Sequence, residues 1–160
     1  MKTILPERSG IIKERLDNTV KEILQIAESK IAMVILFGSY ARGDWVSDLY
    51  QEGGVTYSYQ SDIDLLLVLK NINHKSINLQ YKIEKKFQVD IMREPICTLI
   101  LEPISRINVE LSKGHYFFSD IIKEGILLYD SKKFQLAEIR ELPWSESRPI
   151  AKDDFEQMNR

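Results

Sequence analysis

The distribution of apolar and polar residues divides the chain into alternating helices and strands. Residues 11–29 carry apolar side chains at helical spacing and predict an amphipathic helix. Residues 31–37, IAMVILF, are continuously apolar, which is typical of a strand buried on both faces. Residues 62–69, DIDLLLVL, predict a second strand of this kind, and residues 75–87 predict the next helix.

Beyond residue 87 the patterns are shorter. FQVDIM (87–92) and ICTLIL (96–101) are both compatible with extended structure, and Pro95 separates them. The remaining pattern predicts short helices over 104–113 and 117–124, a strand over 125–130 and a helix over 131–140. This order predicts an α/β (α+β) fold with a mixed sheet of about four to five strands flanked by helices.

Two further segments fall outside the regular pattern. Residues 44–61 are polar and aromatic, and Gly53-Gly54 in their middle predicts a long loop or a hairpin. Residues 141–160 contain prolines and serines and predict a linker or the start of a following helical segment. We therefore expect one domain over residues 1–140.

The clearest chemistry lies at the start of the second strand. Asp62 and Asp64 are two residues apart, so their carboxylates lie on the same side of an extended chain. Neighbouring carboxylates repel each other, and a divalent cation removes that penalty. Oxygen ligands of this kind suit Mg²⁺, which commonly combines one or two carboxylates with substrate phosphates.

The end of the first strand has complementary features. Gly38 lets the backbone approach a bulky anion, and Ser39 begins a predicted helix whose first amides favour anions. Arg42 follows within one turn and can contact a phosphate oxygen. Asp44 is expected to pair with Arg42 or to cap a turn, and Trp45 is expected to pack.

Composition narrows the range of functions. The 22 Lys and Arg and 24 Asp and Glu residues give a net charge of −2, which argues against a long nucleic-acid acceptor. Cys97 is the single cysteine and sits in an apolar context, so we expect a buried thiol. No signal-peptide pattern and no membrane-spanning run is visible, and we expect a cytoplasmic protein.

Other nucleotide and metal motifs fit less well. The glycine segment lacks the Gly-Lys-Ser/Thr ending of a P-loop and the spacing of a dinucleotide fold. His74 and His115 have no partners at zinc spacing.

The stretch LFGSYARGDW followed by SDIDLLLVL resembles the motif of the DNA polymerase beta-like nucleotidyltransferase superfamily, most of all its minimal nucleotidyltransferases. The resemblance implies that Gly38 and Ser39 bind the phosphates of a nucleoside triphosphate, expected to be ATP. It also implies that Asp62 and Asp64 bind Mg²⁺ or Mn²⁺ and promote transfer of the nucleoside monophosphate to a hydroxyl. Similarity over residues 110–130 resembles domains that precede a helical HEPN domain, which implies a HEPN domain or protein as a partner.

The sequence departs from the family pattern in two places. The interval between Ser39 and Asp62 is long, and its excess over residues 49–60 reads as a surface hairpin, a flap over the nucleotide or a platform for the acceptor. Active members also carry a third carboxylate on the next strand. Asp90 is the preferred candidate here and Glu102 the second, while the register of the downstream segment puts Thr98 at that position.

The uncertain identity of the third carboxylate leaves two functions open. The first is a nucleotidyltransferase that uses Asp62, Asp64 and Asp90. The second is a nucleotide-binding or antitoxin-like module of weak activity that acts on a HEPN partner.

Overall fold

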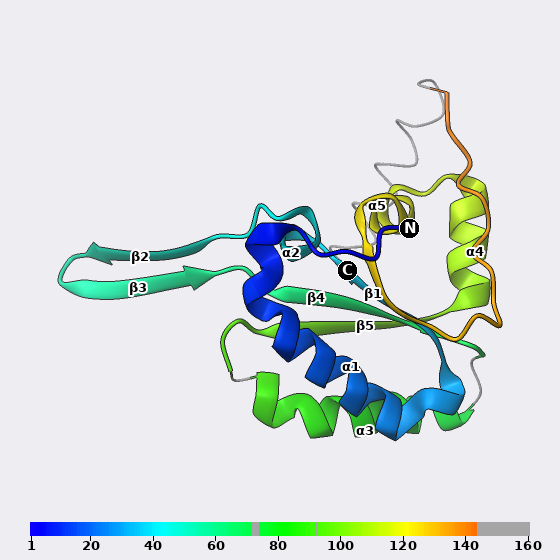
Figure 1. Ribbon diagram of the computed structural model, residues 1–160, viewed down its shortest axis with the longest axis horizontal. Helices are drawn as coiled ribbons and strands as arrows, with labels where there is room; N and C mark the ends of the chain where they lie inside the picture. Colours follow the sequence, from blue (N-terminus) through cyan, green and yellow to red (C-terminus); the bar gives the residue numbers. More distant parts are fainter. Residues whose placement is uncertain (72–73, 92, 144–160) are drawn as a thin grey trace.

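A mixed four-stranded sheet forms the centre of the protein (Figure 1). The computed structural model describes residues 1–71, 74–91 and 93–143. Strand order is β5-β4-β1-β6, with β4 and β5 parallel and the other neighbours antiparallel. The strands are β1 (Ile31–Phe37), β4 (Ile63–Leu69), β5 (Cys97–Pro103) and β6 (Ile126–Asp130). The predicted fold class is thereby confirmed.

Helices cover both faces of this sheet. On one face lie α1 and α3, and on the other lie α4 and α5 (Figure 1). A 3₁₀ turn, η1 (Glu7–Ile12), leads into α1, and a second, η2 (Glu28–Lys30), follows it. The helices are α1 (Lys13–Ala27), α3 (His74–Ile91), α4 (Ile104–Lys113) and α5 (Tyr116–Glu124).

The alternation of side chains along β4 determines where its acidic residue points. Ile63, Leu65 and Leu67 pack into the core beneath α1 and α3. Leu66 and Val68 pack into the core beneath α4 and α5. Because side chains alternate along a strand, Asp64 lies on the α4 and α5 side. The same apolar run that buries the strand therefore carries a carboxylate to one end of the sheet.

The interval between the two central strands forms a short helix and a hairpin. Helix α2 (Ser39–Arg42) follows β1 directly. Strands β2 (Ser47–Glu52) and β3 (Val55–Gln60) pair only with each other among the described residues, and they project away from the body (Figure 1). The hairpin expected around Gly53-Gly54 is confirmed, and both glycines have positive φ, as a two-residue hairpin turn of type I′ requires.

The prediction of an extended segment over residues 87–92 is wrong, since α3 continues to Ile91. Leu79 and Ile83 are buried at a helical spacing of four, and residue 87 continues that spacing in the sequence. No proline interrupts the pattern before Pro95. The prediction of a strand over 96–101 is confirmed by β5.

The helix predicted over residues 131–140 is also wrong. This segment has no helix, and its apolar side chains pack on the α4 and α5 core. Its backbone bonds to α4 instead: Ala137 N donates to Asn108 Oδ1 at 2.7 Å, and Arg140 N donates to the Leu111 carbonyl at 3.0 Å. Tertiary hydrogen bonds have replaced the bonds of a helix.

No helix in the described ranges is both long and apolar enough to cross a bilayer. The expected linker over 141–160 falls almost entirely on residues 144–160, which lie outside the described part of the chain.

Asn108 provides a test of this packing. Its amide donates to the Gln135 carbonyl at 3.2 Å and accepts from Ala137 N. We expect Asn108→Ala to lower the free energy of unfolding by about 1–2 kcal/mol, because both bonds to the 131–143 segment are lost. Urea denaturation measures this. Ser112→Ala on the same helix removes only an exposed bond to the Asn108 carbonyl and should change stability by less than about 0.5 kcal/mol. Equal losses in the two variants would contradict the account.

Candidate active site

A pocket of about 350 Å³ opens where β1 ends and β4 begins. Its lining comes from the bend after β1, from the end of the hairpin and from the start of β4. The lining residues are Gly38, Ser39, Arg42, Tyr59, Gln60, Ser61, Asp62 and Asp64. The structure thus brings five of the six predicted site residues together. A larger pocket of about 660 Å³ lies between α1 and residues 93–97 and shares Gln60 with this one.

Gly38 and Asp64 approach each other closely in this pocket. Phe37 pairs with Asp64 across the antiparallel β1–β4 ladder, which puts the next residue beside the carboxylate. A Cβ atom on Gly38 would lie 2.5 Å from Asp64 Oδ2. Gly38 also has φ 73° and ψ −155°, a conformation that essentially only glycine adopts. Both the space and the backbone conformation therefore require glycine here.

The two carboxylates carry charge that the protein does not neutralise by direct pairing. Asp64 is half-buried and Asp62 is exposed, and among the described residues no ion pair involves either one. Burial raises the pKa of Asp64 to about 6, the charge of Asp62 adds to the rise, and Arg42 opposes it. A divalent cation bound to both oxygens would relieve this repulsion.

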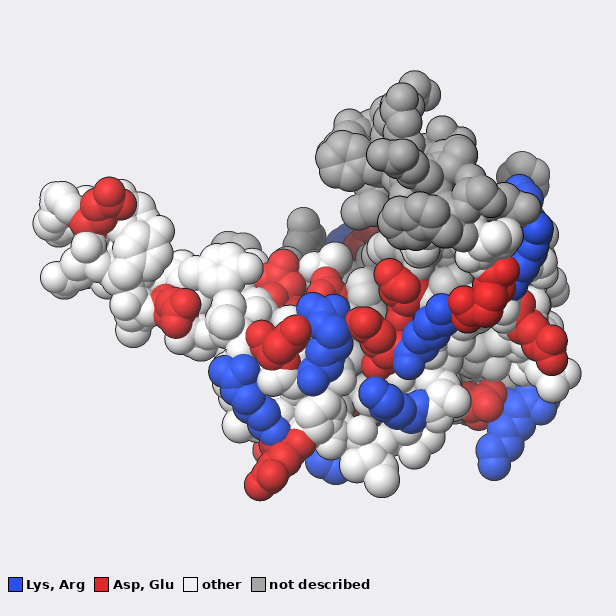
Figure 2. Space-filling model, turned by 90° about the horizontal axis from the view of Figure 1, so that it is seen from above, with Lys and Arg blue, Asp and Glu red and all other residues white. Residues whose placement is uncertain are grey.

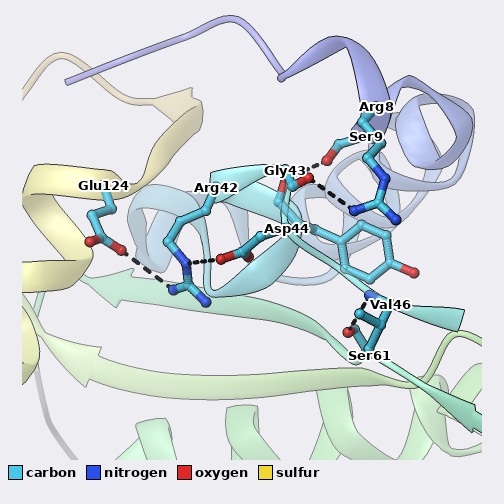
Figure 3. A network of polar contacts seen from close by, with 9 residues as sticks. Arg8, Ser9, Arg42, Gly43, Asp44, Val46, Ser61 and Glu124 are labelled. Atoms are coloured by element: carbon cyan, nitrogen blue, oxygen red, sulfur yellow. Dashed lines mark hydrogen bonds and ion pairs between the residues drawn. The ribbon is translucent and has the colours of Figure 1, made fainter.

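Arg42 is held at the rim of the pocket by two acids (Figure 3). Its Nε donates to Asp44 Oδ2 at 3.1 Å, and its Nη1 donates to Glu124 Oε2 at 3.4 Å. The hydrogen bond to Asp44 is the main cause of a raised pKa of Arg42, so the guanidinium stays charged. The pairing of Asp44 with Arg42 was expected. Glu124 lies 82 positions from Arg42, and no local sequence pattern indicates that the two residues pair.

The N-terminal 3₁₀ turn η1 hydrogen-bonds to the backbone of the segment around α2 that follows the Gly38 bend. Ser9 Oγ donates to the Tyr40 carbonyl at 2.6 Å, and Arg8 Nη1 donates to the Gly43 carbonyl at 3.3 Å (Figure 3). Tyr40 is fully buried and stacks on Trp45 with ring centroids 5.2 Å apart. Trp45 therefore packs, as its sequence context predicted, and α2 is fixed on the side away from the pocket.

A family model described as polymerase beta, nucleotidyltransferase matches residues 18–134. The chain belongs to this nucleotidyltransferase family. The matched range includes every residue of the pocket.

Two relatives come from Methanocaldococcus jannaschii. The nucleotidyltransferase chain is 29% identical over 100 residues to "Putative protein adenylyltransferase MJ0141", covering 57% of this chain and 89% of the relative. It is 27% identical over 117 residues to "Putative protein adenylyltransferase MJ0604", covering 71% and 97% respectively. A solved structure of "a putative nucleotidyltransferase from Sulfolobus solfataricus" aligns with a TM-score of 0.42 at 22% identity, over 86% of this chain and 96% of that one.

The residue beside Asp64 on the neighbouring strand β5 is a threonine. Thr98 pairs with Asp64 in the parallel β4–β5 ladder. Glu102 pairs with Val68 at the far end and contacts Arg106 at 2.8 Å. Asp90 lies on α3 and not on the strand beside β4, so the reason for choosing it fails, and its side chain lies outside the described residues. In the described part of the chain, no three Asp, Glu, His or Cys side chains form a metal-binding group.

Three residues of the pocket were not named as site residues, although two of them fall in the 49–60 segment considered as a flap over the nucleotide. Tyr59, Gln60 and Ser61 end the hairpin and directly precede Asp62. The Ser61 amide donates to the Val46 carbonyl, and the Val46 amide donates to Ser61 Oγ, each at 3.0 Å (Figure 3). The hairpin is thereby fixed to the pocket at its base. Adjacency to the Asp-x-Asp pair was the available signal.

The requirement for glycine at the bend can be tested. Gly38→Ala should lower the free energy of unfolding by about 2–4 kcal/mol, because it adds backbone strain and a clash with Asp64. Gly53→Ala is the control: its φ is also positive, but its Cβ would meet nothing within 4 Å, so about 1 kcal/mol is expected. Urea denaturation compares the two, and an equal loss would show that Asp64 does not restrict the bend.

The raised pKa of Asp64 predicts a pH-dependent stability of the protein without metal. The folded state holds this proton up to about pH 6, whereas an unfolded aspartate releases it near 3.8. The contribution of Asp64 to stability is therefore fully present below about pH 4 and is lost as the pH rises to about 6. Solvent screening limits the loss to about 1–2 kcal/mol.

Asp64→Asn removes this titration. Its free energy of unfolding in urea with chelator should exceed that of the unaltered protein by about 1–2 kcal/mol at pH 7.5, and the difference should vanish near pH 4. Exposed Asp17 on α1, changed to Asn, should show no such difference. If Asp64→Asn were less stable than the unaltered protein at pH 7.5, the claim that the charge of Asp64 is uncompensated in the folded protein would be contradicted.

Proposed function

We propose that this nucleotidyltransferase moves a nucleoside monophosphate from ATP to a hydroxyl of a protein. The observation that carries the proposal is the meeting of the Gly38 bend with the Asp62 and Asp64 carboxylates in one pocket. The family supports nucleotidyl transfer. The names of the two relatives support adenylate as the group and protein as the acceptor.

The donor set fits a divalent metal ion. Asp62 and Asp64 supply carboxylate oxygens beside the pocket, and burial and mutual repulsion disfavour ionised Asp64 without a cation. We assign these two residues to Mg²⁺ or Mn²⁺, with triphosphate oxygens completing the coordination. Such an ion, when bound, neutralises charge on the phosphates and lowers the pKa of an acceptor hydroxyl.

The protein's own groups then position the reactants. Gly38 and Ser39 line the same pocket as Asp62, where their backbone and hydroxyl can bind the terminal phosphates. Arg42 adds positive charge at the rim, aligned by Asp44 and Glu124. The acceptor oxygen bonds to the α-phosphorus as the α–β phosphoanhydride bond breaks. Pyrophosphate leaves, and the hydroxyl proton passes to solvent.

One observation favours a second function. Thr98 occupies the strand position beside Asp64 and cannot accept a proton as a carboxylate does. A module that binds nucleotide and acts on a HEPN partner by contact, with slow transfer, accounts for this residue. The two functions share the site and differ in turnover.

Substitution of the paired carboxylates tests the site. We expect Asp62→Asn and Asp64→Asn to abolish Mg²⁺-dependent ATP binding in calorimetry and to lower nucleotide transfer at least about 100-fold. Asp17→Asn on α1 should behave like the unaltered protein. ATP binding that survives in Asp64→Asn would contradict the assignment. Intact binding without labelled transfer to any protein would favour the second function.

A gain of activity tests whether the site lacks a third carboxylate at Thr98. Thr98 shares its sheet face and register with Asp64, so Thr98→Asp should complete a carboxylate triad and raise transfer by about tenfold. Glu102→Gln and Asp90→Asn should stay within about twofold of the unaltered protein, because Glu102 pairs with Val68 at the far end of β5 and Asp90 lies on α3. Loss of transfer in Asp90→Asn would instead restore Asp90 as the third catalytic carboxylate.

A further inference from the structure

The β2–β3 hairpin, here called the arm (residues 46–61), presents an aromatic face to solvent. Tyr50 and Tyr57 are cross-strand partners and stack with ring centroids 5.2 Å apart. Alternation puts Val55 and Tyr59 on the same face. These four side chains are 43–59% exposed. The Tyr50–Tyr57 stack stabilises the hairpin but leaves both side chains exposed, and exposed apolar patches commonly mark interaction sites.

The aromatic face continues into the active site. Tyr59 lines the pocket together with Asp62 and Asp64. The two Val46–Ser61 hydrogen bonds fix the base of the arm one residue before Asp62. Each strand of the arm has six residues, so a segment lying along the arm extends roughly 20 Å from the pocket. A polypeptide bound there would have one of its residues at the reacting phosphate.

The charge of this region indicates the kind of polypeptide. Asp48 and Glu52 lie on the same face as the tyrosines. The arm has acidic and neutral residues but no lysine or arginine (Figure 2). From residue 44 to residue 69 the chain carries no cationic residue and five acids, namely Asp44, Asp48, Glu52, Asp62 and Asp64. Nucleic acid is repelled by such a surface, whereas lysine and arginine pair with the acids and stack on tyrosine rings.

We infer that the arm is the docking surface for the acceptor, an extended and basic polypeptide segment that delivers its hydroxyl to the Asp62–Asp64 pocket. This inference rests on the proposed function for the identity of the acceptor. Among the described residues β2 and β3 pair only with each other, so their outer edges can also bind the backbone of an extended segment.

Direct binding tests the inference without depending on catalysis. The probes are fluorescein-labelled peptides of alternating lysine and tyrosine, a matched glutamate–tyrosine peptide and a labelled single-stranded oligonucleotide. Anisotropy should show that the full chain prefers the lysine–tyrosine peptide. Asp48→Asn with Glu52→Gln should weaken that binding by roughly fivefold to tenfold. Asp17→Asn with Glu28→Gln, the same loss of charge on α1 and η2, should stay within about twofold.

A second variant tests the aromatic face. Tyr50→Thr with Tyr57→Thr should weaken binding by more than about tenfold, since aromatic side chains dominate such contacts. Because this change also removes the stack that holds the arm together, the charge variant decides the outcome.

Several results would overturn the inference. They are equal effects of the two charge variants, tighter binding of the acidic peptide or the oligonucleotide, no binding of the basic peptide, and sedimentation showing that the arm pairs two copies of the chain. Calorimetry with ATP and Mg²⁺ on the same proteins keeps the two proposals apart. The arm variants should bind ATP normally. If the unaltered protein does not bind ATP, the proposed function is contradicted. The peptide-binding result would still test the docking surface in that case.

Discussion

The close approach of Gly38 to the Asp64 carboxylate is the constraint on which the rest of the site depends. The antiparallel β1–β4 ladder brings these two residues together, and the missing Cβ leaves room for the carboxylate. The backbone conformation of Gly38 then turns the chain into α2, which carries Ser39 and Arg42 to the lining of the same pocket. One tertiary contact thus places the Gly38–Ser39 bend beside a pair of acids in one pocket.

The same end of the sheet concentrates negative charge without neutralising it. Arg42 is shared between Asp44 and Glu124, and it only partly offsets the burial of Asp64. Natural proteins retain such an unfavourable arrangement where a ligand supplies the missing charge. At the pocket the proposed divalent cation would supply this charge, and along the arm the proposed basic polypeptide would. Electrostatics therefore links the proposed nucleotide and the proposed acceptor.

Much of this organisation could be predicted from the sequence, because the decisive elements are strongly patterned. The continuous apolar runs of β1 and β4 and the spacing of Asp62 and Asp64 require no knowledge of distant contacts. The predictions for two segments failed for physical reasons. Residues 131–140 satisfy their backbone through Asn108 and Leu111 of α4, and residues 87–91 extend a helix that a short β-like pattern concealed. Glu124 entered the site through tertiary placement that local sequence does not encode.

The most direct test is a crystal structure of the protein with Mn²⁺ and a non-hydrolysable ATP analogue. We predict anomalous density for manganese between Asp62 and Asp64, with the terminal phosphates against Gly38 and Ser39. A triphosphate bound instead in the larger pocket between α1 and residues 93–97, or manganese away from both carboxylates, would contradict the central claim.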